Sequence, residues 1–185
     1  MAESKGTDGA LSIGFLHPDL GIGGAERLVV DAAHGLAKQK GHRVTMYTSH
    51  FNKERCFAEC NSGSFPTRVH GDFLPRHIAG RLHILFALLR NIWLAIRVGL
   101  SPRERHDVLV CDQISVCVPI LRLLCPRSRI LFYCHFPDQL LSKRESVLKK
   151  LYRVPFDLTE EVTTGMADCT LVNRYGVMGR RRGWV

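Results

Sequence analysis

The stretch that decides the fold is Leu11-Ser12-Ile13-Gly14-Phe15-Leu16-His17, which runs into the turn Pro18-Asp19-Leu20-Gly21-Ile22-Gly23-Gly24. A short apolar run that breaks into glycines and restarts as an amphipathic segment is typical of a strand, a tight loop and a helix. Backbone N–H groups at such a turn can approach a phosphate, so the turn is a potential anion site. The alternative is that Gly21, Gly23 and Gly24 serve only the sterics of the turn.

The residues after this turn extend the pattern. Apolar residues at three- and four-residue spacing predict a helix over residues 24–40, and the β-branched run 43–48 predicts a second strand. A strand-helix-strand unit predicts a parallel pair with a right-handed crossover. We expect a loop over residues 49–65 and a weak strand over 67–70.

The end of the second strand argues against a dinucleotide site. A fold that binds NAD carries an acidic residue there to hold the ribose, and this chain has Thr48-Ser49-His50. An NAD-dependent oxidoreductase is therefore disfavoured.

The alternation of strands and helices resumes after residue 101. We expect strands over 107–112, 129–135 and 168–173, a short helix over 115–125, and two helical pieces, 145–153 and 156–167, that Pro155 separates. Continuous apolar strands are typical of a parallel sheet with helices on both faces. The sequence predicts an α/β domain over residues 11–173 with an open, doubly wound, Rossmann-like sheet, preceded by a disordered leader over 1–10.

Composition narrows the function classes. The 185 residues are 45% hydrophobic and 23% charged, which is ordinary for one globular domain. A net charge of +9 suits nucleic acid, an anionic membrane or a phosphate-bearing substrate. Nucleic acid is disfavoured because the chain has no zinc spacing, RNA-stacking motif or clear helix-turn-helix. Seven cysteines without a Cys-x-x-Cys pair indicate a reducing compartment and no metal site.

Residues 82–100 form an apolar segment that is nearly long enough to cross a bilayer. Arginines in mid-segment would cost roughly 2.5 to 3.5 kcal/mol each at the bilayer centre, which argues against a simple span. His83, Arg90 and Arg97 are seven residues apart, so on a helix they form one basic stripe. We expect a helix in the membrane interface with its arginines reaching lipid headgroups. The alternative is a core helix beside the sheet.

Two further strand ends carry polar residues. Asp112 and Gln113 could hydrogen-bond a sugar hydroxyl, or could cap the following helix. In Cys134-His135-Phe136-Pro137-Asp138, Pro137 forces Phe136 into an extended conformation and leaves His135 at the end of its strand. A lone histidine is often only a satisfied polar group, so a ligand-binding role and a structural role both stay open at this point.

Four runs together resemble the N-terminal half of family 4 glycosyltransferases of the GT-B fold: residues 15–28, 110–113, 130–138 and 160–173. The resemblance implies a retaining mannosyltransferase that forms α-1,3 and α-1,6 linkages. The donor would be GDP-mannose and the acceptor dolichol-pyrophosphate-linked mannosyl-chitobiose. The implied location is the cytosolic face of the endoplasmic reticulum membrane, with other glycosyltransferases of the pathway as candidate partners and with no cofactor or metal.

The resemblance also implies roles for residues. Gly23 and Gly24 would lie near the diphosphate and the acceptor, and a neutral His135 would face the reacting sugar and donate a hydrogen bond to a hydroxyl as a positioning residue. The further candidates for donor or acceptor contact come from their places at strand ends and are Gly21, Asp112, Gln113 and Asp138.

Residues 174–185 depart from the family pattern and are rich in arginine. We therefore expect a truncated chain that lacks the donor domain and is inactive alone. The alternative function is a non-catalytic, membrane-bound interaction module.

Overall fold

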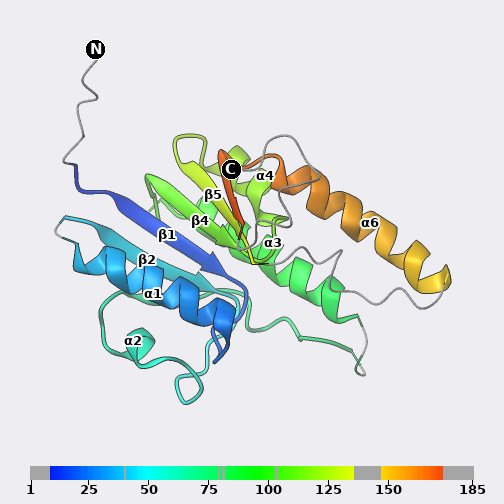
Figure 1. Ribbon diagram of the computed structural model, residues 1–185, viewed down its shortest axis with the longest axis horizontal. Coiled ribbons are helices and arrows are strands. Elements are labelled where there is room, and N and C mark those ends of the chain that lie inside the picture. Colours follow the sequence, from blue (N-terminus) through cyan, green and yellow to red (C-terminus); the bar gives the residue numbers. More distant parts are fainter. Residues whose placement is uncertain are drawn as a thin grey trace, which may run out of the picture.

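The fold is one six-stranded, wholly parallel sheet of order β3-β2-β1-β4-β5-β6 (Figure 1). The computed structural model describes residues 9–39, 41–78, 80, 82–102, 104–135 and 147–172, with side chains from residue 154 on in the last range. The strands are β1 (Ser12–His17), β2 (Arg43–Thr48), β3 (Thr67–Val69), β4 (Val108–Asp112), β5 (Arg129–Cys134) and β6 (Cys169–Val172). The helices are α1 (Gly24–Lys38), α2 (Ala58–Asn61), α3 (His83–Leu100), α4 (Cys117–Leu124) and α6 (Val147–Thr164). This arrangement confirms the predicted open, doubly wound sheet.

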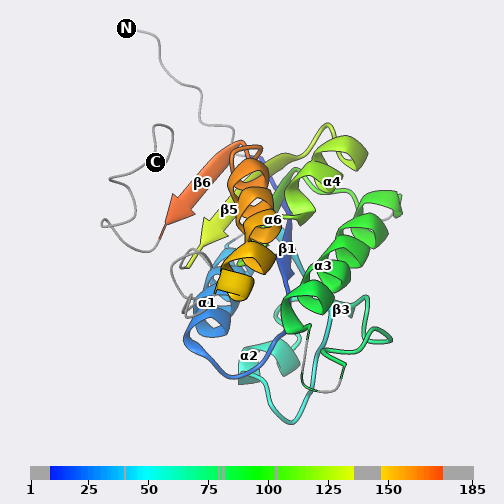
Figure 2. The same ribbon diagram turned by 90° about the vertical axis from the view of Figure 1, so that its right-hand side faces the viewer.

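The core lies in two layers, one on each face of the sheet. Successive residues of a strand point to opposite faces, so Phe15 packs beneath α1 whereas Leu16 packs beneath α3 and α4. Met46 and Val30 belong to the first layer, and Leu94 to the second. Figures 1 and 2 show α1 on one side of the sheet and α3 and α4 on the other.

Two predicted boundaries are wrong. The expected loop over residues 49–65 contains α2, which buries Cys60 and is tied to α1 by an ion pair of 2.8 Å between Arg27 and Glu59. Pro155 does not break the chain into two helices, because α6 continues through it. The proline is exposed, so water can bind the carbonyl that loses its helical partner.

The basic stripe predicted along α3 is also wrong at Arg90. That side chain is only 6% exposed and lies on the buried face of α3 with Asn91, Leu94 and Val98, whereas His83 and Arg97 are exposed. Residues seven apart rotate by only about 20° per step around a helix, so the spacing alone does not separate them. Arg90 differs because other segments cover α3 at mid-length, where the charges of Asp19, Asp72 and Arg76 act on its guanidinium. Arg90 therefore cannot reach lipid headgroups as predicted.

Helix α3 lies against α4 at a glycine. A Cβ atom built on Gly99 would lie 2.6 Å from Cβ of Leu124, closer than two carbon atoms can approach. The two helices therefore pack backbone to side chain at this point, which holds α3 against α4 on the face of the sheet where α3 contacts β2.

Candidate active site

The strand order places the predicted site residues together. In a doubly wound sheet, ligands bind beyond the carboxyl ends of the strands where the strand order reverses, here between β1 and β4. The glycine turn follows β1, Gln113 follows β4, and His135 follows β5. Because β1, β4 and β5 are neighbours, these loops meet at one edge of the sheet.

Three side chains from these strand ends form a buried cluster. Nδ1 of His17 lies 2.6 Å from Oδ2 of Asp112, and Nε2 of His135 lies 2.8 Å from Oδ1 of the same carboxylate. The side chains of His17 and Asp112 are each 1% exposed, and that of His135 is 16% exposed. Asp112 thus joins a fully buried histidine to one at the surface of the site.

This geometry decides between the two roles considered for Asp112. The N-cap residue of α4 is Val116, and no side chain of the described loop caps the helix. The helix-capping alternative is therefore wrong for Asp112. Sequence reasoning did not single out His17, because its partner Asp112 is 95 positions away in the chain. The available signal was that one central strand ends in histidine and another ends in aspartate.

Gln113 is exposed and has a left-handed backbone, with φ of 63°. An L residue with a side chain rarely adopts this conformation, and such strain concentrates at functional sites. The backbone N–H of Gln113 donates to the carbonyl of Tyr133 at 3.2 Å, which fixes the loop after β4 against β5. The amide side chain is thereby presented at the edge where His135 lies.

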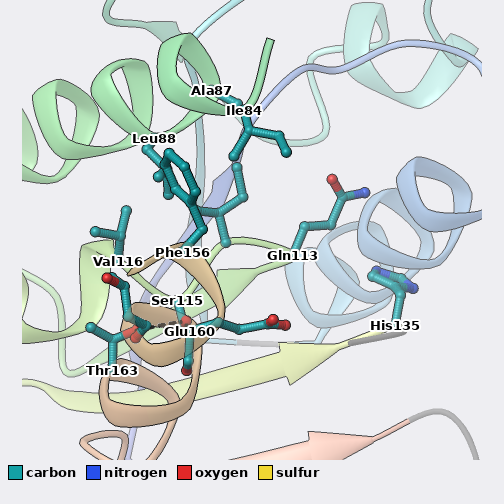
Figure 3. A pocket seen from close by; sticks show the side chains of 12 residues that line it. Ile84, Ala87, Leu88, Gln113, Ser115, Val116, His135, Phe156, Glu160 and Thr163 are labelled. Atoms are coloured by element: carbon teal, nitrogen blue, oxygen red, sulfur yellow. Dashed lines mark hydrogen bonds between the residues drawn. The ribbon is translucent and has the colours of Figure 1, made fainter. Parts of the chain in front are cut away.

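A cleft of 400 Å³ opens beside these residues, between α3 and α6 (Figure 3). Its apolar wall includes Ile84 and Leu88 of α3 and Phe156 of α6, and its polar side includes Gln113 and His135. In Figure 3 the Glu160 side chain extends from α6 toward the polar side. A buried hydrogen bond of 2.7 Å between Ser115 and Thr163 fixes α6 to the loop after β4.

The glycine turn has free space beside two of its three glycines. A Cβ atom on Gly23 would overlap the carboxylate of Glu26, whereas one on Gly21 or Gly24 would meet no atom of the described chain within 4 Å. Helix α1 starts at Gly24 without a side-chain cap from the residues described around it. Both charge signs line the neighbouring cavity of 290 Å³, where Asp19 and Arg76 pair at 3.0 Å. An anion site at this turn stays a prediction.

Two further findings bear on the predicted residues. Asp138 lies outside the described residues. Within the described ranges, no group of three His, Cys, Asp or Glu side chains is arranged to hold a metal ion.

Curated relatives share close similarity with this chain. The alpha-1,3/1,6-mannosyltransferase of Eremothecium gossypii is 54% identical over 166 residues, which make up 89% of this chain and 32% of that protein. The protein of the same name from Homo sapiens is 51% identical over 179 residues, or 94% of this chain and 42% of that protein. The chain thus spans 32 to 42% of the length of these relatives.

Solved structures share the fold at low identity. UGT2 of Phytolacca americana, in complex with UDP-2fluoro-glucose and pterostilbene, aligns with a TM-score of 0.60 at 14% identity over 90% of this chain and 48% of that chain. The lipopolysaccharide outer core galactosyltransferase WaaB aligns with a TM-score of 0.56 at 12% identity over 90% of this chain and 40% of that chain. These likenesses agree with a Rossmann-like domain of a GT-B glycosyltransferase.

The family assignment rests on most of the chain. The model of Glycosyltransferase Family 4 matches residues 22–175, a range that includes α1, the β4 loop and His135. The chain belongs to glycosyltransferase family 4.

Proposed function

We propose that this chain forms one wall of the cleft of an α-1,3/1,6-mannosyltransferase. The donor is GDP-mannose and the acceptor is dolichol-pyrophosphate-linked mannosyl-chitobiose. The observation that carries the proposal is the meeting of His135 and Gln113 at the mouth of a cleft with an apolar wall. The similarity to mannosyltransferases over about nine tenths of the chain supports it.

His135 positions the reacting sugar in this proposal. Its ring lies at the strand end, where an imidazole nitrogen can hydrogen-bond a sugar hydroxyl. Gln113 offers an amide with both a donor and an acceptor, which suits a second hydroxyl. Correct placement of a substrate supplies a large part of a rate enhancement, so loss of such a contact lowers turnover strongly.

A chimera tests this role directly. Residues 11–172 would replace the matching segment of a full-length relative, and mannose transfer to the lipid-linked acceptor would be measured. We expect the chimera to be active and its His135→Ala form to lose about 10²-fold in rate. His42→Ala is the matched control, since His42 precedes β2 at the opposite ends of the strands, where its Nδ1 accepts from the N–H of Leu11 at 3.2 Å. Equal rates for the His135→Ala chimera and the unmutated chimera would remove His135 from the site.

The 185-residue chain alone is expected to transfer no mannose. The proposal gives it one wall of the cleft, and it spans 32 to 42% of the relatives' length. Measured turnover by the isolated chain would refute this part.

Membrane contact is proposed through an apolar stripe on the outer face of α3. Leu85, Leu89 and Trp93 are exposed at helical spacing, and exposed Phe73 packs edge to face on Trp93 at 5.4 Å between ring centroids. By length and composition α3 could span a bilayer, yet 33% of it is buried against the rest of the fold. An interfacial position on the cytosolic face of the endoplasmic reticulum fits both features.

Co-sedimentation with liposomes checks the stripe. Leu89→Glu is expected to reduce the bound fraction, because a charge then faces the acyl chains. Leu123→Glu is the control, since Leu123 is an exposed leucine of α4 outside the stripe. Equal binding of both variants would contradict membrane contact through α3.

A second candidate function is a non-catalytic, membrane-bound interaction module that pairs with a full-length transferase. The exposed apolar residues Val154, Leu158 and Val162 follow one another at four-residue spacing along α6 and favour it. Gel filtration with a full-length relative should then show a complex that Leu158→Lys abolishes. Independent elution of the two proteins would contradict the interaction module and leave the transferase wall as the remaining proposal.

A further inference from the structure

We infer that Asp112 and His17 are positioning residues that determine which ring nitrogen of His135 carries a proton. In the neutral ring, Asp112 keeps the proton on Nε2 and leaves Nδ1 of His135 as a hydrogen-bond acceptor. The role of His135 in sugar transfer rests on the proposed function. The position of the proton rests only on the contacts among His17, Asp112 and His135.

The Asp112 carboxylate lies between two histidine rings. Asp112 is 1% exposed, and each of its two oxygens faces a different imidazole, at 2.6 Å and 2.8 Å. An ionised carboxylate only accepts hydrogen bonds. Nδ1 of His17 is in hydrogen-bond geometry with Oδ2 and must therefore carry hydrogen. Nε2 of His135 is at ion-pair distance from Oδ1, where the negative charge favours an N–H over a lone pair on that nitrogen.

The two ring nitrogens of His17 have different surroundings. Its other nitrogen, Nε2, is buried and has no hydrogen-bond partner among the described residues. A proton there would be a buried donor without an acceptor, which is unfavourable. Nδ1 is thus the nitrogen of His17 that donates, and its hydrogen bond fixes the rotation of the Asp112 carboxylate.

His135 contacts both Asp112 and Tyr133. Its Nε2 lies 2.8 Å from Oδ1 of Asp112, at ion-pair distance but outside hydrogen-bond geometry. The ring also packs edge to face on Tyr133, with centroids 4.7 Å apart. Only Nδ1 remains for a ligand. A neutral His135 therefore accepts a hydrogen bond from a sugar hydroxyl, which reverses the direction expected from the sequence.

Nitrogen NMR of the histidine rings tests the proton placement in this chain without any activity assay. For the neutral rings, we expect the Nε2–H form for His135 and the Nδ1–H form for His17. In Asp112→Asn the amide can accept from one ring only and must donate to the other. One of the two histidines must then move its proton to the opposite nitrogen.

Asp72→Asn is the matched control, because Asp72 faces Nδ1 of His50 at 2.5 Å in an exposed pair. It should alter the signals of His50 and leave His135 unchanged. An Nδ1–H form for His135 in the unmutated chain would overturn the inference. Unchanged proton positions in folded Asp112→Asn would overturn it as well.

Two variants of His17 keep the inference testable if Asp112→Asn does not fold. Asn places an amide N–H near the position of Nδ1, so His17→Asn should preserve the His135 spectrum. His17→Leu removes the donor, and the His135 ring should then lose its preference for the Nε2–H form. Identical His135 spectra in the two variants would overturn the role of His17.

The same pair of variants in the active chimera separates the two proposals. Misplacement of a positioning group lowers kcat more than it raises KM, so His17→Leu should lose about 10²-fold in kcat while His17→Asn retains most of it. An altered His135 spectrum in His17→Leu without loss of kcat would keep the proton placement but refute the proposed role of His135 in transfer.

Discussion

At the residue scale, a second buried histidine makes stability depend on pH. His106 lies at the opposite edge of the sheet, where its Nε2 is 2.7 Å from the Tyr47 hydroxyl and its Nδ1 is 3.0 Å from Oγ of Ser12. Burial, and next the charge of Arg43, lower the pKa of His106 from 6.5 to about 4. The folded protein therefore keeps this ring neutral in mild acid.

The free energy of unfolding should fall as the pH drops from 6.5 to about 4. In this window the unfolded chain binds a proton on His106 that the folded chain does not, so acid favours unfolding by up to about 3 kcal/mol. Urea unfolding at several pH values checks this, with His106→Gln as the comparison. Parallel pH profiles for the two proteins would show that His106 is not the group responsible.

Individual site residues were predictable from the sequence, but their partners were not. Asp112, Gln113 and His135 were found because each follows an apolar run, which marks the end of a buried strand. The partnership of His17 with Asp112 was not found, since those residues are 95 positions apart and meet only once β1 and β4 pair. Asp112 showed two possible roles in the sequence, and only distances to both histidines distinguish a bridging carboxylate from a helix cap.

At the element scale, the position of α3 in the sequence was predictable, whereas the side of the helix that faces the sheet was not. The sequence predicted a helix over residues 82–100, close to the observed His83–Leu100. It did not predict that Arg90 faces inward, because a helix that is apolar on most sides does not indicate which side meets the sheet. The same limit applies to α2, whose 4 residues are too few to show a period.

Gly99 fixes the distance between α3 and α4. Gly99→Ala should lower the free energy of unfolding by about 1 to 3 kcal/mol, because the added Cβ overlaps Leu124 and forces the helices apart. Gly35→Ala in the exposed part of α1 meets no described atom within 4 Å and should raise stability by about 0.5 to 1 kcal/mol through helix propensity. Thermal unfolding of both variants measures the contrast, and a stabilising Gly99→Ala would contradict the close packing.

At the scale of the whole molecule, charge and apolar surface make separate contributions to membrane binding. The chain has a net charge of +9. Binding to anionic vesicles should therefore weaken as salt rises, since exposed charges are screened over about 10 Å at 0.1 M salt. The part that depends on the α3 stripe should persist at high salt and disappear in Leu89→Glu. Complete loss of binding of the unmutated chain in salt would mean that charge alone holds the protein to lipid.

The parallel sheet was predictable from alternating apolar strands and helices, because such strands are buried on both faces. The order of the strands in the sheet could not be predicted from the sequence, because it depends on the face of the sheet over which each connecting helix crosses. The structure places β1 between β2 and β4, in register from Ile13 to Val44 and from Ile13 to Val108.

This central position of β1 has a consequence for how the protein is made. The strand leaves the ribosome early, yet its second neighbour is 95 residues further along the chain, as in the contact between Ser12 and Asp107. Until β4 has been synthesised, the apolar β1–β2 unit has an open edge that can pair with other chains. Newly made protein is thus most vulnerable to aggregation while α3 is being translated, and chaperone binding to nascent chains should peak at that length.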